Sequence, residues 1–150
     1  MKNRTLEREL FINKPIKEVF AFFSNASNLN LITPPWLHFE IITATPIQMQ
    51  LDSKIDYRLR LHKIPINWKT EITTWEPPNR FVDSQIKGPY AVWNHEHCFV
   101  SQNGGTLMTD LIEYRSRGLI FEPIIYHLFV KKDVQRIFDY RREKFKDILE

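Results

Sequence analysis

The sequence contains little cysteine and little glycine, two residue types on which many small functional sites depend. Its single cysteine, Cys98, excludes an internal disulfide, a CxxC redox pair and a four-cysteine zinc site. With only 4 glycines in 150 residues, the chain has almost nothing from which to build a glycine-rich loop around a phosphate. These shortages exclude several redox and metal-binding classes and argue against a phosphate cradle.

Neither an excess of one charge nor a long apolar run is present. With 21 basic and 18 acidic side chains, the net charge is +3, which is too balanced for a nucleic-acid-binding protein. The longest apolar stretch, residues 119–130, is interrupted by Glu122 and His127 and is shorter than the roughly 20 residues of a membrane span. Residues 1–10 are charged throughout and lack the apolar core of a signal peptide. We therefore expect a soluble cytoplasmic protein without a membrane span or a nucleic-acid partner.

Aromatic side chains, by contrast, are abundant, with 11 Phe, 5 Tyr and 4 Trp. A chain of 150 residues is the length of one domain. A domain of this size buries about 70% of the surface of its unfolded chain, so a core or an internal cavity is feasible. We expect a single domain over residues 1–150, a monomer or weak homodimer, whose interior the aromatic rings line or fill.

The hydrophobic pattern changes its period along the chain, which predicts an α+β fold. Residues 5–12 alternate as a strand, and residues 15–23 and 25–31 have the spacing of two short helices. The period is then two, and the predicted strands cover residues 37–44, 54–62, 66–75, 79–87, 91–101 and 106–115. Short connections, above all Asn103-Gly104-Gly105, favour antiparallel hairpins.

Beyond Gly118 the hydrophobic period becomes that of a long amphipathic helix. Its apolar stripe consists of Ile124, Leu128, Val134, Ile137, Phe138, Phe145, Ile148 and Leu149. Basic residues occupy the rest of the helix: Lys131, Lys132, Arg136, Arg141, Arg142, Lys144 and Lys146. Because Asp133, Asp139, Glu143 and Asp147 alternate with them, we interpret these charges as a solvated, ion-paired face. The apolar stripe must lie against the sheet.

Several motifs accompany this order of elements. They are Trp68, Glu76-Pro77-Pro78-Asn79-Arg80-Phe81-Val82-Asp83, Gly88-Pro89-Tyr90, Trp93-x-His95-x-His97-x-Phe99 and Ile137-Phe138-Asp139-Tyr140-Arg141. In these motifs and in its element order, the chain resembles the START-like superfamily from about residue 6 to residue 149. More narrowly, it resembles the polyketide cyclase/dehydratase-type ligand-binding proteins of the SRPBCC group.

The resemblance implies a helix-grip fold. In that fold a curved antiparallel sheet of about seven strands wraps around a long C-terminal helix, and two short helices follow the first strand. A deep apolar cavity lies between the sheet and the helix. The group includes carriers of small hydrophobic molecules as well as cyclases, and it has no universal catalytic motif that could be transferred to this chain.

Alternation along each strand assigns side chains to the inner or the outer face of the sheet. Cys98 falls on the outer face, where we expect an inert thiol rather than a nucleophile. The residues assigned to the inner face are Ile55, Tyr57, Leu59, Leu61, Trp68, Thr70, Ile72, Phe81, Asp83, Gln85, Trp93, His95, His97, Phe99, Met108, Asp110, Ile112 and Tyr114. Trp36 is a further ring expected inside.

From the inner face and the final helix we select the residues that would contact a ligand. They are Tyr57, Leu59, Trp68, Ile72, Phe81, Gln85, Trp93, His95, His97, Phe99, Asp110, Ile112, Tyr114 and Phe138. The aromatic and aliphatic members would bury an apolar molecule, and the polar members would orient it.

The inner face also collects polar side chains: Asp83, Gln85, His95, His97, Asp110 and Tyr114. An unpaired buried polar group costs about 1–3 kcal/mol, so these groups must satisfy one another, hold water or meet a ligand.

Three interpretations of the histidine pair remain open at this stage. His95 and His97 point to one side of a strand and could ligate a metal together with Asp110. Alternatively, a hydrogen-bonded His/Asp network stiffens the wall of the cavity. In the third interpretation the residues orient a ligand or act as catalytic acids and bases, with His95, His97, Asp110 and Asp83 as the catalytic candidates.

The sequence favours the binding of a small hydrophobic molecule and predicts no cofactor and no metal. The alternative is a cyclase, dehydratase or isomerase that acts on a polyketide-like or aromatic substrate through the four acid–base candidates. A structural or protein-interaction domain with a filled core is a third hypothesis. It would require an exposed apolar patch near residues 119–130.

Overall fold

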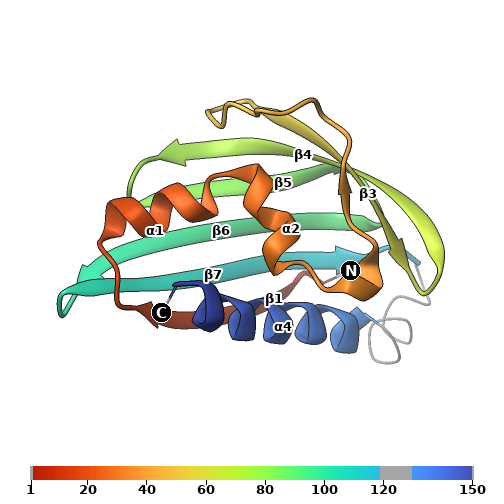
Figure 1. Ribbon diagram of the computed structural model, residues 1–150. Helices are drawn as coiled ribbons and strands as arrows, with labels where there is room; N and C mark the ends of the chain where they lie inside the picture. Colours follow the sequence, from red (N-terminus) through yellow and green to blue (C-terminus); the bar gives the residue numbers. More distant parts are fainter. Residues whose placement is uncertain (1, 119–129, 150) are drawn as a thin grey trace.

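A computed structural model of the chain describes residues 2–118 and 130–149. Seven antiparallel strands form one curved sheet in the order β1-β7-β6-β5-β4-β3-β2 (Figure 1). The strands are β1 (Arg4–Ile12), β2 (Glu40–Ile41), β3 (Lys54–Leu61), β4 (Ile64–Glu76), β5 (Arg80–Lys87), β6 (Tyr90–Gln102) and β7 (Gly105–Ser116). The helices are α1 (Ile16–Phe23), α2 (Leu29–Ile32) and α4 (Lys131–Leu149). The predicted helix-grip architecture is confirmed.

The strands β6 and β7 are joined by the hairpin that the sequence predicts. Asn103 and Gly104 have positive φ angles of 50° and 77°, and Gln102 pairs directly with Gly105. Two consecutive residues with positive φ match the right-handed twist of the flanking strands, and Asn-Gly tolerates this geometry best. The hairpin fixes the register of the two longest neighbouring strands, on which most of the candidate polar site lies.

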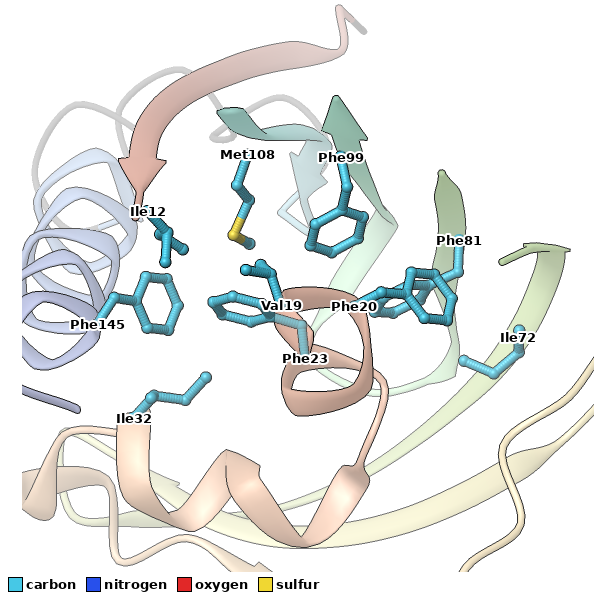
Figure 2. Close-up of a cluster of buried hydrophobic side chains, with 10 residues drawn as sticks. All are labelled: Ile12, Val19, Phe20, Phe23, Ile32, Ile72, Phe81, Phe99, Met108 and Phe145. Carbon is cyan, nitrogen blue, oxygen red and sulfur yellow. The ribbon is translucent and has the colours of Figure 1, made fainter. Parts of the chain in front are cut away.

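Helices α1, α2 and α4 lie on the concave face of the sheet, where their apolar faces form a common core with it (Figure 2). The ring of Phe23 in α1 meets that of Phe145 in α4 at 4.5 Å in an edge-to-face contact. Phe99 of β6 lies 5.4 Å from Phe20 of α1. These ring contacts join α1 to α4 and α1 to the sheet, and they therefore help to set the distance between the two helices.

Two side-chain contacts join α4 to other elements of the fold. Arg8 of β1 donates to Asp139 at 3.0 Å, and His62, in the turn between β3 and β4, lies 2.8 Å from Asp133. The helix is thereby held at both the β1 edge and the β3–β4 hairpin. None of the helices within the described ranges is both long and apolar enough to cross a membrane.

The segment between α1 and β3 differs from its prediction. The expected strand 37–44 is reduced to the two residues of β2, because Pro35–Leu37 forms a 3-10 turn and His38 has a left-handed φ of 47°. The expected second helix is split into a 3-10 turn, Ala26–Asn28, and α2. Asn25 caps the turn by accepting a hydrogen bond from the Ser27 amide at 3.0 Å. In this segment the prolines and the side-chain hydrogen bond of Asn25 stabilise turns. These turns take the place of the longer strand and the longer helix that were expected.

The first part of the predicted C-terminal helix, with Ile124 and Leu128, lies outside the described residues. So does the stretch 119–130 apart from Val130. Within the described part, Val134, Phe138 and Phe145 of the predicted apolar stripe are buried.

Candidate functional site

A cavity of about 160 Å³ lies between the inner face of β3 to β6, the α1–α2 segment and helix α4. Eight aromatic rings line it: Phe23, Phe39, Tyr57, Trp68, Phe81, Tyr90, Trp93 and Phe138. Its polar wall residues are Thr33, Thr70, Asp83, His95, His97 and Arg141. An apolar pocket with a few convergent polar groups is the usual form of a small-molecule site.

One part of the wall is built from edge-to-face aromatic contacts. The rings of Trp68 and Trp93 stand 5.3 Å apart at 88°, and Tyr90 lies 5.7 Å from Trp68 and 4.8 Å from Trp93. Such arrangements fix each ring by its quadrupole as well as by its area. The three rings therefore pack against one another and form one continuous aromatic part of the cavity wall.

Three polar wall residues, Asp83, His95 and His97, form a cluster with Asp110, which lies behind them, on three adjacent strands. Nε2 of His95 donates to Asp110 at 2.6 Å, and Nε2 of His97 donates to Asp83 at 2.7 Å. Direct cross-strand register pairs Asp83 with His95 and His97 with Asp110, so both hydrogen bonds run diagonally. The His95 and His97 rings stack at 3.7 Å, and Phe81 stacks on His97 at 4.1 Å.

The pKa values of the two histidines shift in opposite directions because their surroundings differ. Burial, followed by the neighbouring His97, lowers the pKa of His95 despite its bond to Asp110. Burial also acts to lower the pKa of His97, but Asp110 and Asp83 outweigh it, so that this pKa is raised. Nδ1 of His97 lies 3.4 Å from Asp110, within ion-pair distance but outside hydrogen-bond geometry. The cluster thus stacks a ring whose pKa is lowered on a ring whose pKa is raised.

Both carboxylates of the cluster stay ionised. Burial by itself would raise the pKa of Asp110, but the hydrogen bonds and charges of His95 and His97 lower it. The pKa of Asp83 is lowered in the same way, against burial, by its bond to His97 and by the charges of His95, His97 and Arg141. Two ionised carboxylates, Asp83 in the wall and Asp110 behind it, therefore lie near Arg141.

Arg141 is a cavity-lining residue that the sequence analysis placed on a different face of the helix. It was assigned to the solvated face of the final helix, but it lines the cavity. Its guanidinium lies 5.0 Å from the ring centroid of Phe138 and 5.6 Å from that of Phe145. The missed signal is spacing, because Arg141 follows Phe138 by three residues and precedes Phe145 by four, which places all three on one helix face.

Most of the predicted ligand contacts do line the cavity: Tyr57, Leu59, Trp68, Ile72, Phe81, Trp93, His95, His97 and Phe138. Others form no part of its wall: Gln85, Phe99, Asp110, Ile112 and Tyr114. Phe99 belongs to the core under α1, and Ile112 and Tyr114 belong to a second core cluster beneath α4. Asp110 lies behind the histidines and holds His95.

The side chain of Gln85 serves the β5–β6 hairpin instead of the cavity. Its amide nitrogen donates to the Tyr90 carbonyl at 2.8 Å, and its amide oxygen accepts from the Tyr90 N–H at 3.1 Å. A Cβ at Gly88 would come within 2.5 Å of Gln85, so the glycine makes room for this arrangement. Strand alternation assigned Gln85 to the correct face of the sheet. It could not predict that the side chain would bond to the backbone of Tyr90 instead of lining the cavity.

Two further expectations concern residues outside the cavity. Trp36 was expected inside but is 43% exposed, and its ring contacts Tyr140 at 5.6 Å and the Arg136 guanidinium at 4.6 Å. Cys98 lies on the outer face and donates to Glu96 at 3.0 Å. Burial, and then this bond, raise the pKa of the thiol to about 11, so it is a poor nucleophile at neutral pH.

The metal-binding interpretation finds a different set of ligands from the one expected. Asp83, His95 and His97 each place one potential ligand atom within 4.8 Å of the others, whereas the sequence analysis named Asp110 as the third ligand. A bound cation would compete with hydrogen bonds of 2.6 Å and 2.7 Å. It would also be repelled by the positive charge of Arg141. This electrostatic balance favours the hydrogen-bonded network.

Solved structures with this fold are found across bacteria and plants. Protein Ms6760 from Mycobacterium smegmatis is 15% identical, with 97% of this chain and 90% of that chain covered and a TM-score of 0.71. The Zhui aromatase/cyclase from Streptomyces sp. R1128 is 14% identical, with coverage of 95% and 91% and a TM-score of 0.72. Major latex-like protein 151 from Panax ginseng is 11% identical, with coverage of 99% and 98% and a TM-score of 0.68. At these identities the similarity establishes the fold.

The family of the chain is identified by its sequence. The sequence has no match among curated proteins. However, the profile of a family described as polyketide cyclase / dehydrase and lipid transport matches residues 12–138. This range runs from the last residue of β1 to Phe138 in α4 and contains the residues of the cavity wall except Arg141. The START-like resemblance is confirmed, and the chain belongs to the polyketide cyclase / dehydrase and lipid transport family.

Proposed function

We propose that the protein binds a small hydrophobic molecule in the cavity between the sheet and helix α4. The observation that carries this proposal is the cavity of about 160 Å³, lined by eight aromatic rings and one compact polar cluster. Membership in a family whose description includes lipid transport supports it. An apolar cavity of about 150 Å³ accommodates a benzene-sized molecule, so an aromatic ring fits without movement of the wall.

The proposal predicts that filling the cavity abolishes binding. Ala26 lines the cavity and is 2% exposed, so the ring of an Ala26→Phe variant would occupy the space of the ligand. We expect ethylbenzene to shift the indole N–H signals of Trp68 and Trp93 in a nuclear magnetic resonance titration of the wild type. In Ala26→Phe the dissociation constant should rise at least about tenfold, the equivalent of 1.4 kcal/mol.

The matched control is Ala21→Phe, since Ala21 is exposed on α1, and it should leave ethylbenzene binding unchanged. Trp75 does not line the cavity, and its indole signal serves as the internal reference. Equal ethylbenzene affinity in Ala26→Phe and wild type would rule out this cavity as the binding site.

A second candidate function is acid–base catalysis on the bound molecule. The observation that favours it is the opposite shift of two stacked histidines, since the pKa of His95 is lowered and that of His97 is raised. Paired titratable groups with diverging pKa values are typical of acid–base sites. With Nε2 bound to Asp110, Nδ1 of His95 would be the atom that accepts a proton, and His97, whose pKa is raised, would supply one.

This function predicts catalysed exchange of the methyl protons of acetophenone for deuterium in D2O. His95→Gln should reduce the protein-dependent exchange rate by about 10²-fold or more, the usual contribution of a positioned general base. His38→Gln is the control, because His38 is exposed in a loop and should have no effect. If wild-type protein does not accelerate exchange above the buffer rate, the catalytic candidate is wrong and binding alone remains.

We also propose that the protein works as one cytoplasmic domain, as a monomer or weak homodimer, without a nucleic-acid partner. The balance of 21 basic and 18 acidic residues supports the last point, since nucleic-acid affinity derives from an excess of cations facing phosphates. The apolar cavity supports a small molecule as the principal partner.

A further inference from the structure

Arg141 occupies an unusual position for an arginine on an amphipathic helix. It lies on the inner face of α4 with Phe138 and Phe145 and contributes to the cavity wall. The two rings hold its guanidinium at 5.0 Å and 5.6 Å by cation–π contact. Contact with ring faces orients a guanidinium without using its N–H donors. The group is therefore fixed in place while its hydrogen-bonding capacity remains unused.

No acceptor among the described residues takes up these donors. Nε of Arg141 is buried and has no hydrogen-bond partner within residues 2–118 and 130–149. The nearby carboxylates Asp83 and Asp110 accept hydrogen bonds from His97 and His95, and neither carboxylate is hydrogen-bonded to Arg141. Burial lowers the pKa of Arg141 while Asp110, Asp83 and Tyr57 oppose that effect, so the guanidinium feels these groups without bonding to them. A buried donor left unpaired is costly, and a charged one is more so.

Tyr57 of β3 adds a neutral donor to the same cavity. Its side chain is buried and lines the cavity, and its ring lies 5.0 Å from Phe39. Burial and the charge of Asp83 raise its pKa, so the hydroxyl stays protonated at all physiological pH values. It makes no hydrogen bond with any described residue. Two side chains on opposite elements, β3 and α4, thus offer free donors to one space.

We propose that Arg141 and Tyr57 form an anion subsite that binds the carboxylate of a small aromatic acid. The proposal rests on the proposed binding function and specifies its ligand. A guanidinium donates two parallel hydrogen bonds to a carboxylate, and such charge-assisted pairs are about twice as strong as neutral ones. The aromatic wall of Trp68, Trp93 and Tyr90 would accept the ring to which the carboxylate is attached.

Size and charge restrict the ligand to this class. A cavity of about 160 Å³ has room for one aromatic ring with a small substituent, by comparison with the roughly 150 Å³ that holds benzene. A phosphate ester would bring two negative charges to a single unpaired guanidinium beside two ionised aspartates. A singly charged carboxylate gives Arg141 one counter-ion of its own and leaves the His/Asp cluster intact.

The test uses three probes of nearly equal size, benzoate, acetophenone and ethylbenzene, titrated against the Trp68 and Trp93 signals. In Arg141→Met the dissociation constant of benzoate should rise about 10- to 100-fold, as expected for a lost charged hydrogen bond, while that of ethylbenzene stays within about twofold. Tyr57→Phe should weaken benzoate by up to about tenfold, as for a neutral hydrogen bond. Arg142→Met is the matched control, because Arg142 is the exposed neighbour on α4.

A second readout separates ligand binding from a structural role of Arg141. If Arg141 serves to bind an anion, it is an unpaired buried charge in the unliganded protein. Arg141→Met should then raise the melting temperature of the unliganded protein. If Arg141 instead stabilises the His/Asp cluster, Arg141→Met should lower that temperature and weaken all three probes together. The latter result would overturn the subsite.

The outcomes distinguish this subsite from the underlying binding function. If the benzoate-to-ethylbenzene affinity ratio is the same in wild type and Arg141→Met, the anion subsite is wrong while cavity binding stands. If none of the three probes shifts the Trp68 and Trp93 signals in the wild type, cavity binding itself fails. A ratio that falls only in Arg141→Met, and not in Arg142→Met, supports the subsite.

Discussion

Replacing Asp110 by alanine is expected to lower the free energy of unfolding by about 3–5 kcal/mol, the usual effect of breaking a buried ion pair. Asp110 is 6% exposed, and the two histidines that it faces are 3% and 4% exposed. The variant would leave His95 without its partner at 2.6 Å and His97 with Asp83 as its one remaining carboxylate partner in the cluster. Denaturation by guanidinium chloride at pH 7 measures the change.

The pH dependence of this difference identifies its electrostatic origin. The histidines lower the pKa of Asp110 against burial, so its stabilising charge is fully present above the unfolded pKa of about 3.9. The difference between wild type and Asp110→Ala should shrink as the pH falls below about 4, toward the folded pKa. Asp56→Ala is the control, since Asp56 forms an exposed 3.7 Å pair with Lys69 and should cost under about 1 kcal/mol. A similar loss for Asp56→Ala and Asp110→Ala would refute the role of the cluster.

Replacing Phe145 by alanine is expected to destabilise the protein by about 3–5 kcal/mol, as is typical of a buried phenylalanine in a core. Phe145 is 3% exposed and meets Phe23 edge to face at 4.5 Å, which joins α4 to α1 (Figure 2). The loss combines the transfer free energy of the ring with the cavity it leaves. Urea denaturation monitored by circular dichroism measures it.

Ile148→Ala provides the comparison on the same helix. Ile148 is 39% exposed, so its truncation should change the free energy of unfolding by less than about 1 kcal/mol, as surface substitutions usually do. If Phe145→Ala cost no more than Ile148→Ala, helix α4 would not be held to α1 by this contact, and the packing described above would be wrong.

The fold was largely predictable because its signals are local. Asn103 and Gly104 define a tight hairpin through backbone conformations that few other residues adopt. Strand alternation placed His95 and His97 on one buried face, since i and i+2 side chains share a side. The failure at residues 37–44 has a local cause too, because Pro35–Leu37 closes a 3-10 turn where periodicity alone suggested a strand.

The candidate site was predictable only in part. Alternation brought Asp83, His95 and His97 to the inner face, but it could not reveal that the hydrogen bonds run diagonally between strands. Arg141 was assigned to the solvated face because it is charged. Its spacing from Phe138 and Phe145 places it on the inner face of the helix instead. Gln85 was misplaced because its amide found the Tyr90 backbone, a contact that depends on the shape of the hairpin.

By itself, the sequence determined the order of elements, the family, and the supply of aromatic and titratable side chains to one face of the sheet. These follow from periodicity and turn chemistry, which act over a few residues. Only the tertiary structure decided which of those side chains face an open space of about 160 Å³ and which fill the core. Whether a side chain faces the open space or the core depends on the distance between α4 and the sheet, which the Phe23–Phe145 contact helps to set. This contact joins segments more than 100 residues apart in the sequence.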